Sequence, residues 1–446
     1  MVTKTVPKKV IVIGSGLCGL TAAYRLKQKG FDPVVLERAE RFGGRTITDV
    51  ENGWVNDLGG SLLATTYVEA LALADELGLQ SMKEPFGGSM QIVIKGVFHS
   101  LPMDNPAISV LKAPYLSWKS KLSLVRLVPT LLVNWKKLNL TNLAGCADLD
   151  TETAEAFCLR TVTEEAYDLL LNPLTRAMFG HDCNEISVVE LLWMIKIYAT
   201  CSAVAFTGGM KTLTSALAKD LQVLTGHEAI RVDENSDGVV VTAKTANGEV
   251  TLNADYCAIA ADGKDMQRIY GHALTVPQND FLTQLLYNPL SMVFFKFRER
   301  PKEEGFIVEI PRSEDPEVAA FAWYHLWGKT KVPADKGAVI FLGMNEWQFR
   351  MADKSNEERF ASARHYLRKY YPQLDSLVEG VEVTPWPRGT TVGTQGNYQR
   401  LRKFVADIKP NGRVQYGGDY MSQSSIGTAV ATGEDLARRM TAAAQT

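Results

Sequence analysis

KVIVIGSGLCGLTAAYRLKQKGFDPVVLE, residues 9–37, is the stretch that decides the fold of this chain. It opens with a run of β-branched residues, which predicts a buried parallel strand. A glycine-rich turn follows, and Ala, Leu and Arg then recur at helical spacing over 20–29. A second apolar strand ends on Glu37. This order predicts a βαβ unit of the Rossmann type.

The glycine-rich turn has the pattern GxGxxG, in which each glycine has a separate task. Gly14 permits the tight turn off the strand, Gly16 lets the backbone approach a pyrophosphate, and Gly19 lets helix and strand pack closely. The N–H groups that open the helix favour negative phosphates. Glu37 stands 18 residues after the last glycine and would accept hydrogen bonds from a ribose diol. The unit therefore predicts a dinucleotide site built from Gly14, Ser15, Gly16, Leu17, Cys18, Gly19 and Glu37.

Two more glycine-rich segments follow directly, RAERFGGR at 38–45 and DLGGS at 57–61. Glycines let the chain lie against a flat cofactor, and Arg45 can neutralise a diphosphate. Nicotinamide enzymes need only the first turn, so these segments favour the longer cofactor FAD. They add to the predicted site Arg38, Gly43, Gly44, Arg45, Gly59, Gly60, Ser61 and Leu62.

The three segments together resemble the flavin amine oxidase superfamily, which includes monoamine and polyamine oxidases, protoporphyrinogen oxidases and phytoene desaturases. Its third signature matches YGGD at 416–419 and IGTAVATG at 426–433. The resemblance implies that the acid near the glycine pair binds the ribityl-phosphate part of FAD and that the last helix opens at the flavin N1/O2 edge. It also implies backbone contact with the adenine near 229–230. The implied residues are Ala229, Ile230, Gly418, Asp419, Ile426, Gly427 and Thr428.

The covalent cysteinyl link of some monoamine oxidases is excluded, because no cysteine stands between 258 and 446. FAD is therefore expected to be bound non-covalently. The six cysteines are scattered without a CxxC pair, so neither a disulfide framework nor a metal site is predicted. Cys18 is interpreted as a small residue that fits the turn.

The predicted fold is an α/β, Rossmann-like FAD-binding domain of the glutathione-reductase type with a discontinuous α+β substrate domain. Strands with tight turns are expected over 223–262, with a hairpin at Asn247-Gly248. The FAD-binding domain is predicted to comprise 1–85, 208–285 and 385–446. The substrate domain is predicted to comprise 86–207 and 286–384.

Composition limits the remaining function classes. The 446 residues include 48 basic and 50 acidic side chains, a formal charge of −2, which argues against a nucleic-acid partner. No run of 18 residues is continuously apolar, and residues 1–9 contain no apolar run before the first strand. A cytoplasmic protein is expected, and the oligomeric state stays open.

One stretch has unusual charge, since residues 105–147 contain six Lys or Arg and no Asp or Glu. Trp118 and Trp135 stand among its leucines. Peripheral membrane contact through 106–140 would suit an apolar substrate. The alternative, a cationic helical face that covers the substrate cavity, is favoured because the charges are spread thinly.

The resemblance also identifies positions beside the flavin and the substrate. The lysine that amine oxidases carry near flavin N5 aligns with Met292, and Lys296 lies four residues on, on the same face. The aromatic pair that frames the flavin would involve Trp386 or Tyr398, with its second member near Ser425. Because Ser425 is not aromatic and Met292 is not lysine, a simple amine oxidase is disfavoured.

Three further residues are weighed as substrate contacts. Alternation in a strand over 321–327 places His325 on one face with two tryptophans, so His325 is a candidate base. A hydrogen-bonded core histidine is the favoured reading. Tyr198 and Phe206 flank the segment that re-enters the flavin domain, where aromatic residues are more often core.

The predicted activity follows from these markers. FTGGM at 206–210 and NPL at 172–174 resemble the protoporphyrinogen oxidase and desaturase branch. We expect an FAD-dependent oxidoreductase that abstracts a hydride from a C–N or C–C bond of an apolar or cyclic small molecule, with reoxidation by O2 or another acceptor. An amine or amino-acid oxidase and a flavin-dependent isomerase without net redox are the alternatives.

Overall fold

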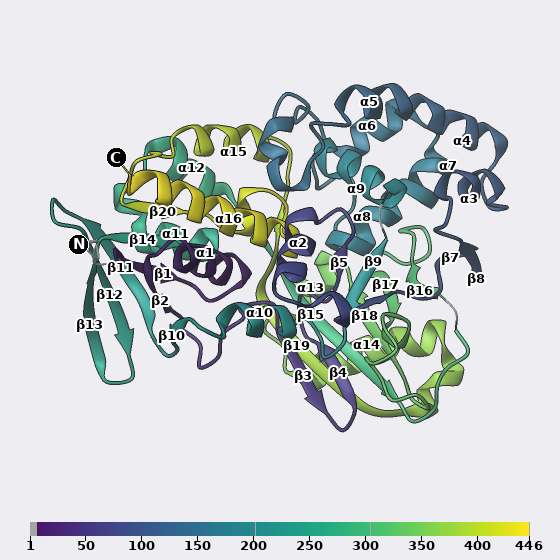
Figure 1. Cartoon of the computed structure of the whole chain (residues 1–446). Coiled ribbons are helices and arrows are strands. Elements are labelled where there is room, and N and C mark those ends of the chain that lie inside the picture. The colour runs from purple at the N-terminus through teal and green to yellow at the C-terminus, as the bar shows by residue number, and fades with distance from the viewer. Residues whose placement is uncertain (1–6, 201, 304, 446) are drawn as a thin grey trace.

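The computed structural model describes residues 7–200, 202–303 and 305–445. Expectations that concern Cys201 and residues 1–6 lie outside this described part. The chain forms two lobes, of which the first contains both described ends of the chain (Figure 1). The second lobe combines a large sheet with a group of helices (Figure 1).

A five-stranded parallel sheet forms the centre of the first lobe, with strand order β10-β2-β1-β14-β20. The predicted α/β class and the βαβ unit are confirmed. The sheet and its first helix comprise β1 (Lys9–Ile13), α1 (Leu17–Gln28), β2 (Asp32–Leu36), β10 (Gln222–Leu224), β14 (Tyr256–Ile259) and β20 (Val414–Tyr416).

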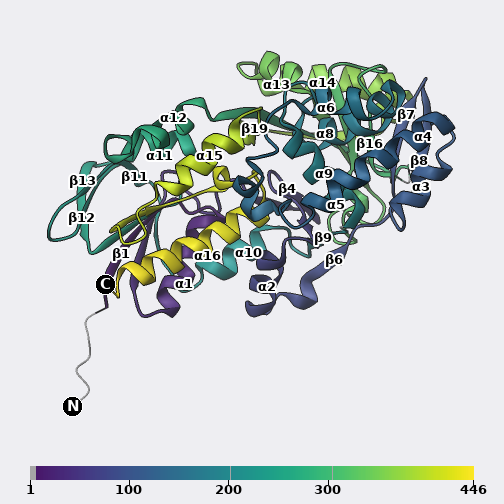
Figure 2. The ribbon, with the colours of Figure 1, turned by 90° about the horizontal axis from the view of Figure 1, so that it is seen from above.

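Both faces of this sheet are buried, which is why β1 is apolar at successive positions. Val10 and Val12 pack with residues of α1 and of α16 (Ile426–Ala443). Ile11 and Ile13 belong to the main core, together with α11 (Gly263–Tyr270), α12 (Val276–Gln284) and α15 (Asn397–Ala406). The helices α1 and α16 lie side by side although they come from opposite ends of the chain (Figure 2).

The expected strands with tight turns are also present. An antiparallel sheet comprises β11 (Glu228–Glu234), β12 (Val239–Thr245) and β13 (Gly248–Ala254). Thr245 pairs with Gly248, which confirms the predicted hairpin. The smaller elements that connect these strands and helices are β3 (Thr48–Glu51), β4 (Trp54–Asp57), β5 (Leu63–Ala64), α2 (Val68–Glu76), η1 (Gln80–Met82), β6 (Lys83–Pro85), β9 (Ala203–Phe206), α10 (Lys211–Ala218), η5 (Gly271–Ala273) and η8 (Asp419–Met421).

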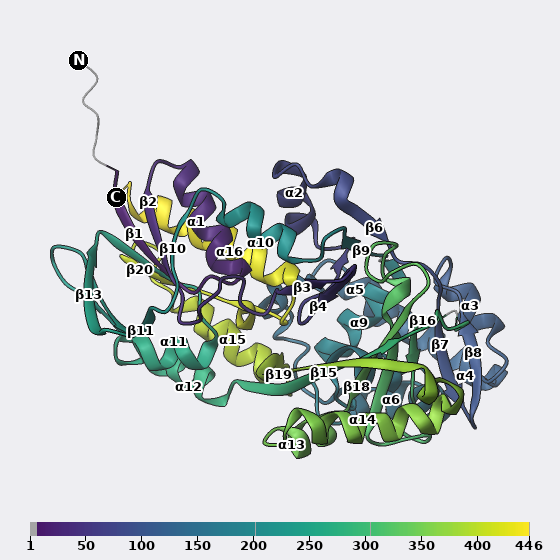
Figure 3. The same ribbon diagram turned by 90° about the horizontal axis from the view of Figure 1, so that it is seen from below.

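A seven-stranded mixed sheet forms the second lobe, with strand order β19-β15-β18-β17-β16-β7-β8. Its outer face packs against α13 and α14 (Figure 3). Its inner face carries side chains of β15 and β17 that pack against the loop after β4. The elements are β7 (Ser89–Ile94), β8 (Val97–Leu101), β15 (Leu286–Phe297), β16 (Gly305–Glu309), β17 (Val318–Trp323), η6 (Tyr324–Leu326), β18 (Gly337–Gly343), α13 (Asn345–Met351), α14 (Asn356–Tyr370), η7 (Pro372–Leu377) and β19 (Val378–Val392).

A helical group completes the second lobe. Buried Arg176 ties it to the sheet, because its guanidinium donates to Ile310 O at 3.1 Å and pairs with Asp182 at 2.8 Å. Among the described residues, no helix has the length and apolar content needed to span a membrane. The elements are α3 (Pro106–Lys112), α4 (Trp118–Ser123), η2 (Leu124–Arg126), α5 (Leu127–Asn134), η3 (Leu140–Cys146), α6 (Ala154–Thr161), α7 (Glu164–Ala166), η4 (Tyr167–Leu171), α8 (Asn172–Phe179) and α9 (Val188–Thr200).

Candidate functional site

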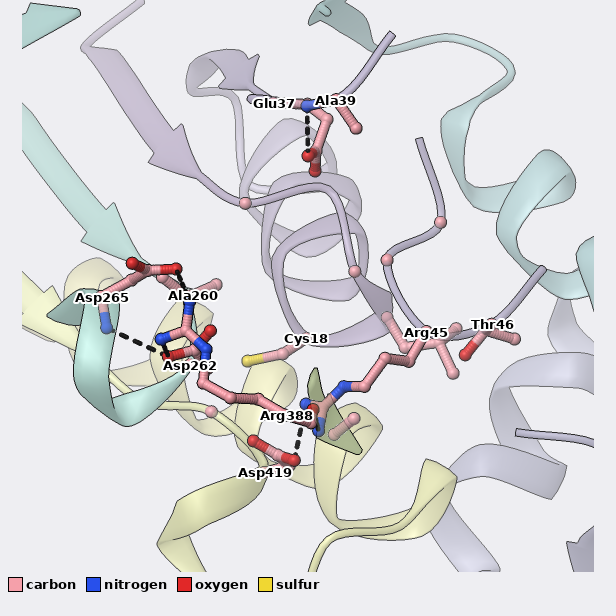
Figure 4. Close-up of a pocket in the computed structure, with 18 of the residues that line it drawn as sticks. Cys18, Glu37, Ala39, Arg45, Thr46, Ala260, Asp262, Asp265, Arg388 and Asp419 are labelled. Atoms are coloured by element: carbon pink, nitrogen blue, oxygen red, sulfur yellow. Dashed lines mark hydrogen bonds and ion pairs between the residues drawn. The ribbon is translucent and has the colours of Figure 1, made fainter. Parts of the chain in front are cut away.

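A cavity of about 500 Å³ opens where the parallel strands β1, β2 and β14 end (Figure 4). Ligands of open α/β sheets bind at this position, outside the carboxyl ends of the strands. The cavity brings together many residues of the predicted cofactor site: Gly14, Gly16, Leu17, Cys18, Glu37, Arg38, Gly43, Gly44, Arg45, Gly59, Gly60, Ala229, Gly418, Asp419 and Ile426.

Seven residues of the predicted cofactor site do not line the cavity, and the structure gives some of them supporting roles. Ser15 donates hydrogen bonds to Glu37, and Gly19 lets α1 pack closely against the turn. The Thr428 N–H donates to the Ser425 hydroxyl, which caps the last helix. The seven are Ser15, Gly19, Ser61, Leu62, Ile230, Gly427 and Thr428.

The glycine turn has the geometry that its three tasks require. Gly14 has a φ of +98°, which L side chains rarely adopt. A Cβ on Gly16 would meet no atom within 4 Å, because this glycine faces the cavity. A Cβ on Gly19 would lie 1.9 Å from Gly14 O, so the helix could not approach the strand. Gly16 thus serves a ligand, and Gly19 serves the packing of the fold.

Glu37 stands at the end of β2 and is fixed by its neighbours. Its Oε2 accepts hydrogen bonds from the Ser15 N–H at 3.0 Å and the Ser15 hydroxyl at 2.5 Å. Its Oε1 accepts one from the Ala39 N–H at 2.9 Å. A carboxylate has about four acceptor sites, so Glu37 keeps capacity for a diol.

Arg45 and Asp419 join the first and last segments of the site (Figure 4). Arg45 Nη2 lies 2.6 Å from Asp419 Oδ2, and the Ser424 hydroxyl donates to the same oxygen at 2.6 Å. Arg45 Nη1 donates to Gly389 O at 2.7 Å. The cavity wall therefore holds a fixed guanidinium, the group best suited to a diphosphate.

Helix α16 begins at the cavity wall. The Ser425 hydroxyl caps it by accepting from the Thr428 N–H at 3.0 Å, and both Ser425 and Ile426 line the cavity. The first N–H groups of a helix have no partner within it, and its N-terminal end carries a partial positive charge. This end favours negative charge in the cavity.

Among the cavity residues that the sequence did not reveal, Arg388, Asp262 and Asp265 form an ion-paired group. Arg388 spans the cavity wall to Asp262 at 2.7 Å and Asp265 at 3.1 Å (Figure 4). Burial raises the pKa of Asp262, which also caps α11. The position of Asp262, three residues after the end of β14, was an available signal, since β14 is parallel to β1.

Of the aromatic residues predicted at the flavin, Trp386 lines the cavity and donates from Nε1 to Leu58 O at 2.6 Å. Tyr398 and Phe206 lie in the core outside the cavity lining. The Tyr398 hydroxyl donates to Glu190 at 2.5 Å. Burial raises the pKa of Glu190 to about 8.

The three weak catalytic candidates do not line the cavity. Met292 packs in an apolar cluster on the inner face of the sheet. Lys296 pairs with Glu382 at 3.2 Å and lies over the Trp54 ring at 5.3 Å. The predicted strand over 321–327 ends at Trp323, and His325 follows in a 3-10 turn with its Nδ1 3.1 Å from Ala338 O. Burial lowers the pKa of His325 to about 4.

A buried carboxylate in the second lobe also escaped the sequence analysis. Glu309 is 2% exposed and accepts a hydrogen bond from the Tyr198 hydroxyl at 3.2 Å. Burial raises the pKa of Glu309 to about 8. Within the described part of the chain, Glu309 forms no ion pair. The only signal in the sequence was an acid at the end of the apolar strand GFIVE, residues 305–309.

The donor set of the cavity fits FAD. The wall of this one cavity presents an acid for a ribose, a fixed arginine, a glycine with open space beside it and a helix N-terminus. Trp386 and Leu290 supply an apolar wall on the side of the seven-stranded sheet. With no cysteine in 258–446, non-covalent binding is expected.

Comparisons with known proteins agree with this geometry. A family model described as flavin containing amine oxidoreductase matches residues 17–441. A relative from Dictyostelium discoideum, named probable flavin-containing monoamine oxidase A, is 41% identical over 445 residues and covers 94% of this chain and 93% of its own. Protoporphyrinogen oxidase 2 of Arabidopsis thaliana is 26% identical over 364 residues, with 69% of this chain and 68% of its own covered.

Among solved structures, wild-type putrescine oxidase bound to putrescine superposes with a TM-score of 0.78 at 20% identity. It covers 98% of this chain and 99% of its own, a likeness that shows the shared fold. The chain therefore belongs to the flavin-containing amine oxidoreductase family and is an FAD-dependent oxidoreductase.

Proposed function

We propose that the enzyme oxidises a C–N bond of a small aliphatic amine that carries a second positive charge. Bound FAD supplies the hydride acceptor. The observation that carries the proposal is Glu309, a buried carboxylate without a cationic partner in the described chain. The name of the Dictyostelium relative supports amine oxidation.

The sheet register relates Glu309 to the cavity. Glu309 pairs with Ala320, and Ala320 pairs with Leu342. Two strand spacings separate Glu309 from Leu342, about 10 Å. Leu342 packs in the same cluster as Leu290, which lines the cavity. β15, which carries Leu290, is one further strand from Leu342, so a substrate would bind on the inner face of the sheet between Leu290 and Glu309 with its charged end at Glu309.

The surroundings of Glu309 suit such a substrate. Its face of β16 continues into an apolar cluster that includes Met90, Ile92 and Leu174, which would accompany methylene groups. The buried Tyr115 hydroxyl has no hydrogen-bond partner among the described residues, and its pKa is raised by burial and by the charge of Glu309. An ammonium group would pair with the carboxylate and thereby offset its desolvation.

The test compares diamines with monoamines of equal chain length, under anaerobic conditions, by bleaching of the flavin band. We expect diamines to bleach it at lower concentration. Glu309→Gln should raise KM for the diamine about 10- to 100-fold, because a buried charge pair is lost, with a small change in kcat. The KM for monoamines should hardly change.

Glu190→Gln is the matched control. Glu190 is also buried, has a tyrosine donor and has a pKa raised by burial to about 8, but it lies on α9 against Tyr398. Its replacement should leave the ratio of diamine to monoamine KM unchanged. A wild-type enzyme with no preference for diamines, or an unchanged ratio in Glu309→Gln, would contradict the proposal.

A second candidate is dehydrogenation of an apolar cyclic substrate. The observation that favours it is that Met292, the residue aligned with the amine oxidase lysine, packs in an apolar cluster. It predicts bleaching by cyclic precursors and none by amines. An oxygen electrode then tests whether O2 is the acceptor, and product without oxygen uptake would support the isomerase alternative.

A further inference from the structure

The helical run 118–134 has its apolar side turned outward. It comprises α4, η2 and α5 in direct succession. Six large apolar side chains on it are between 45% and 81% exposed: Trp118, Leu122, Val125, Val128, Leu132 and Val133. Their spacing of three and four residues places most of them on one side of the run. We call these six side chains the outward apolar face.

The opposite side of the same run is buried, and it carries Ser120, Ser123 and Asn134 besides the core residue Leu127. The Ser120 hydroxyl lies 2.5 Å from the Thr163 hydroxyl, and the Ser123 hydroxyl accepts from the Thr163 N–H at 3.2 Å. Buried Asn134 donates to Thr130 O at 2.9 Å. The run therefore cannot rotate to bury its exposed apolar side without losing the two bonds to Thr163 and the core packing of Leu127.

The neighbouring helix α3 extends the apolar surface. Its residues Ile108 and Leu111 are both exposed. The helices α3, α4 and α5 lie at the edge of the second lobe away from the nucleotide-binding lobe (Figures 1 and 2). Exposed apolar helix faces of this kind mark interaction sites.

The stretch of chain that carries the outward apolar face has charges of one sign. Residues 105–147 contain no acid, and Lys119, Lys136 and Lys137 are exposed beside it. The Lys121 ammonium lies 4.9 Å from the centroid of the Trp118 ring. Glu165 lies beside the start of the run, where its carboxylate accepts hydrogen bonds from the Ser117 N–H and hydroxyl.

We propose that the outward apolar face binds the interface of an anionic lipid bilayer. Its apolar side chains would enter the acyl boundary, and the lysines would lie at the phosphate level, as in helices that lie in the membrane plane. Tryptophan is enriched at this depth of a bilayer. A second copy of the chain is a poorer partner, because pairing of two such faces would bring like charges together.

The proposal does not depend on the substrate. The test is sedimentation of the FAD-loaded enzyme with vesicles of phosphatidylcholine alone or with 30% phosphatidylglycerol, about a third anionic lipid. We expect binding to the anionic vesicles, weakened by salt, and little binding to the neutral ones. Replacement of Trp118, Leu122 and Leu132 by Ser should reduce binding about tenfold or more, with flavin content unchanged.

The control replaces three exposed apolar residues elsewhere, Val68, Val276 and Phe349, by Ser. It should bind vesicles as the wild type does. Absence of wild-type binding to anionic vesicles would overturn the proposal, as would equal loss in the control. A concentration-dependent dimer that the Trp118, Leu122 and Leu132 variant abolishes, without vesicle binding, would assign the face to a second copy and overturn it too.

Discussion

Two glycines of the turn serve different purposes, one cofactor binding and the other folding. The missing Cβ of Gly16 leaves space in the cavity, whereas the missing Cβ of Gly19 leaves room for the backbone of Gly14. The sequence predicted both tasks, because the strand, turn and helix fix where each glycine stands. It did not reveal Glu309, since strand alternation alone does not tell a solvent-facing acid from an inward one.

At this scale we predict opposite outcomes for two alanine substitutions. Gly16→Ala should fold normally, since φ is −67° there and its Cβ meets nothing, but should weaken FAD binding. Gly19→Ala should lower the free energy of unfolding of the apoprotein by about 1–3 kcal/mol or more, as overpacking does. Urea unfolding without FAD and flavin titration separate the two. Equal loss of apoprotein stability in both variants would refute this division.

At the scale of elements, helix α16 links the cofactor cavity to the packing of the first lobe. Its cap Ser425 lines the cavity, and its body packs along α1. The family resemblance places the second member of an aromatic pair near Ser425, which is not aromatic. The structure shows that the Ser425 hydroxyl instead caps α16. The local pattern is compatible with this cap, since a serine stands directly before the first helical residue Ile426.

Ser425→Ala should cost about 1 kcal/mol of stability, as loss of an N-cap does, and should also weaken FAD binding. Ser355→Ala is the matched control, because Ser355 caps α14 on the outer face of the second lobe. It should cost a similar amount of stability and leave the flavin Kd unchanged. Chemical denaturation and flavin fluorescence titration measure both effects. A Kd that shifts equally in the two variants would count against a role of the α16 N-terminus.

Strand ends were the weakest part of the prediction. The expected alternation of Trp323, His325 and Trp327 fails because β17 ends at Trp323 and a 3-10 turn follows. Periodicity does not mark such an end when no Gly or Pro stands at it. Lys296 does share a face with Met292, but a partner from β19, Glu382, holds it, and that pairing depends on contacts remote in sequence.

At the scale of the whole molecule, the two buried carboxylates make global stability depend on pH. Their pKa values are raised from 4.5 to about 8 in Glu190 and Glu309. Between these values the folded state keeps protons that the unfolded state has released, so stability falls as pH rises from about 4.5 to 8. The upper limit is about 1.4 kcal/mol per pH unit for each group.

We therefore predict a lower unfolding midpoint in urea at pH 8 than at pH 6. The double variant Glu190→Gln with Glu309→Gln should show a flatter dependence, because glutamine does not titrate. Each single variant should lie between the two. A wild-type midpoint that rises over this interval would show that other groups dominate.

The cavity wall consists of three separate stretches, 13–60, 227–290 and 386–429, and this has a consequence for synthesis. The last of them leaves the ribosome well after the first two. A nascent chain thus cannot bind its flavin before this stretch is made. A polypeptide truncated before residue 386 lacks the stretch and should bind no flavin. Flavin supply in the cell acts on finished chains, so vitamin shortage should appear as accumulated apoprotein rather than as stalled or shortened product.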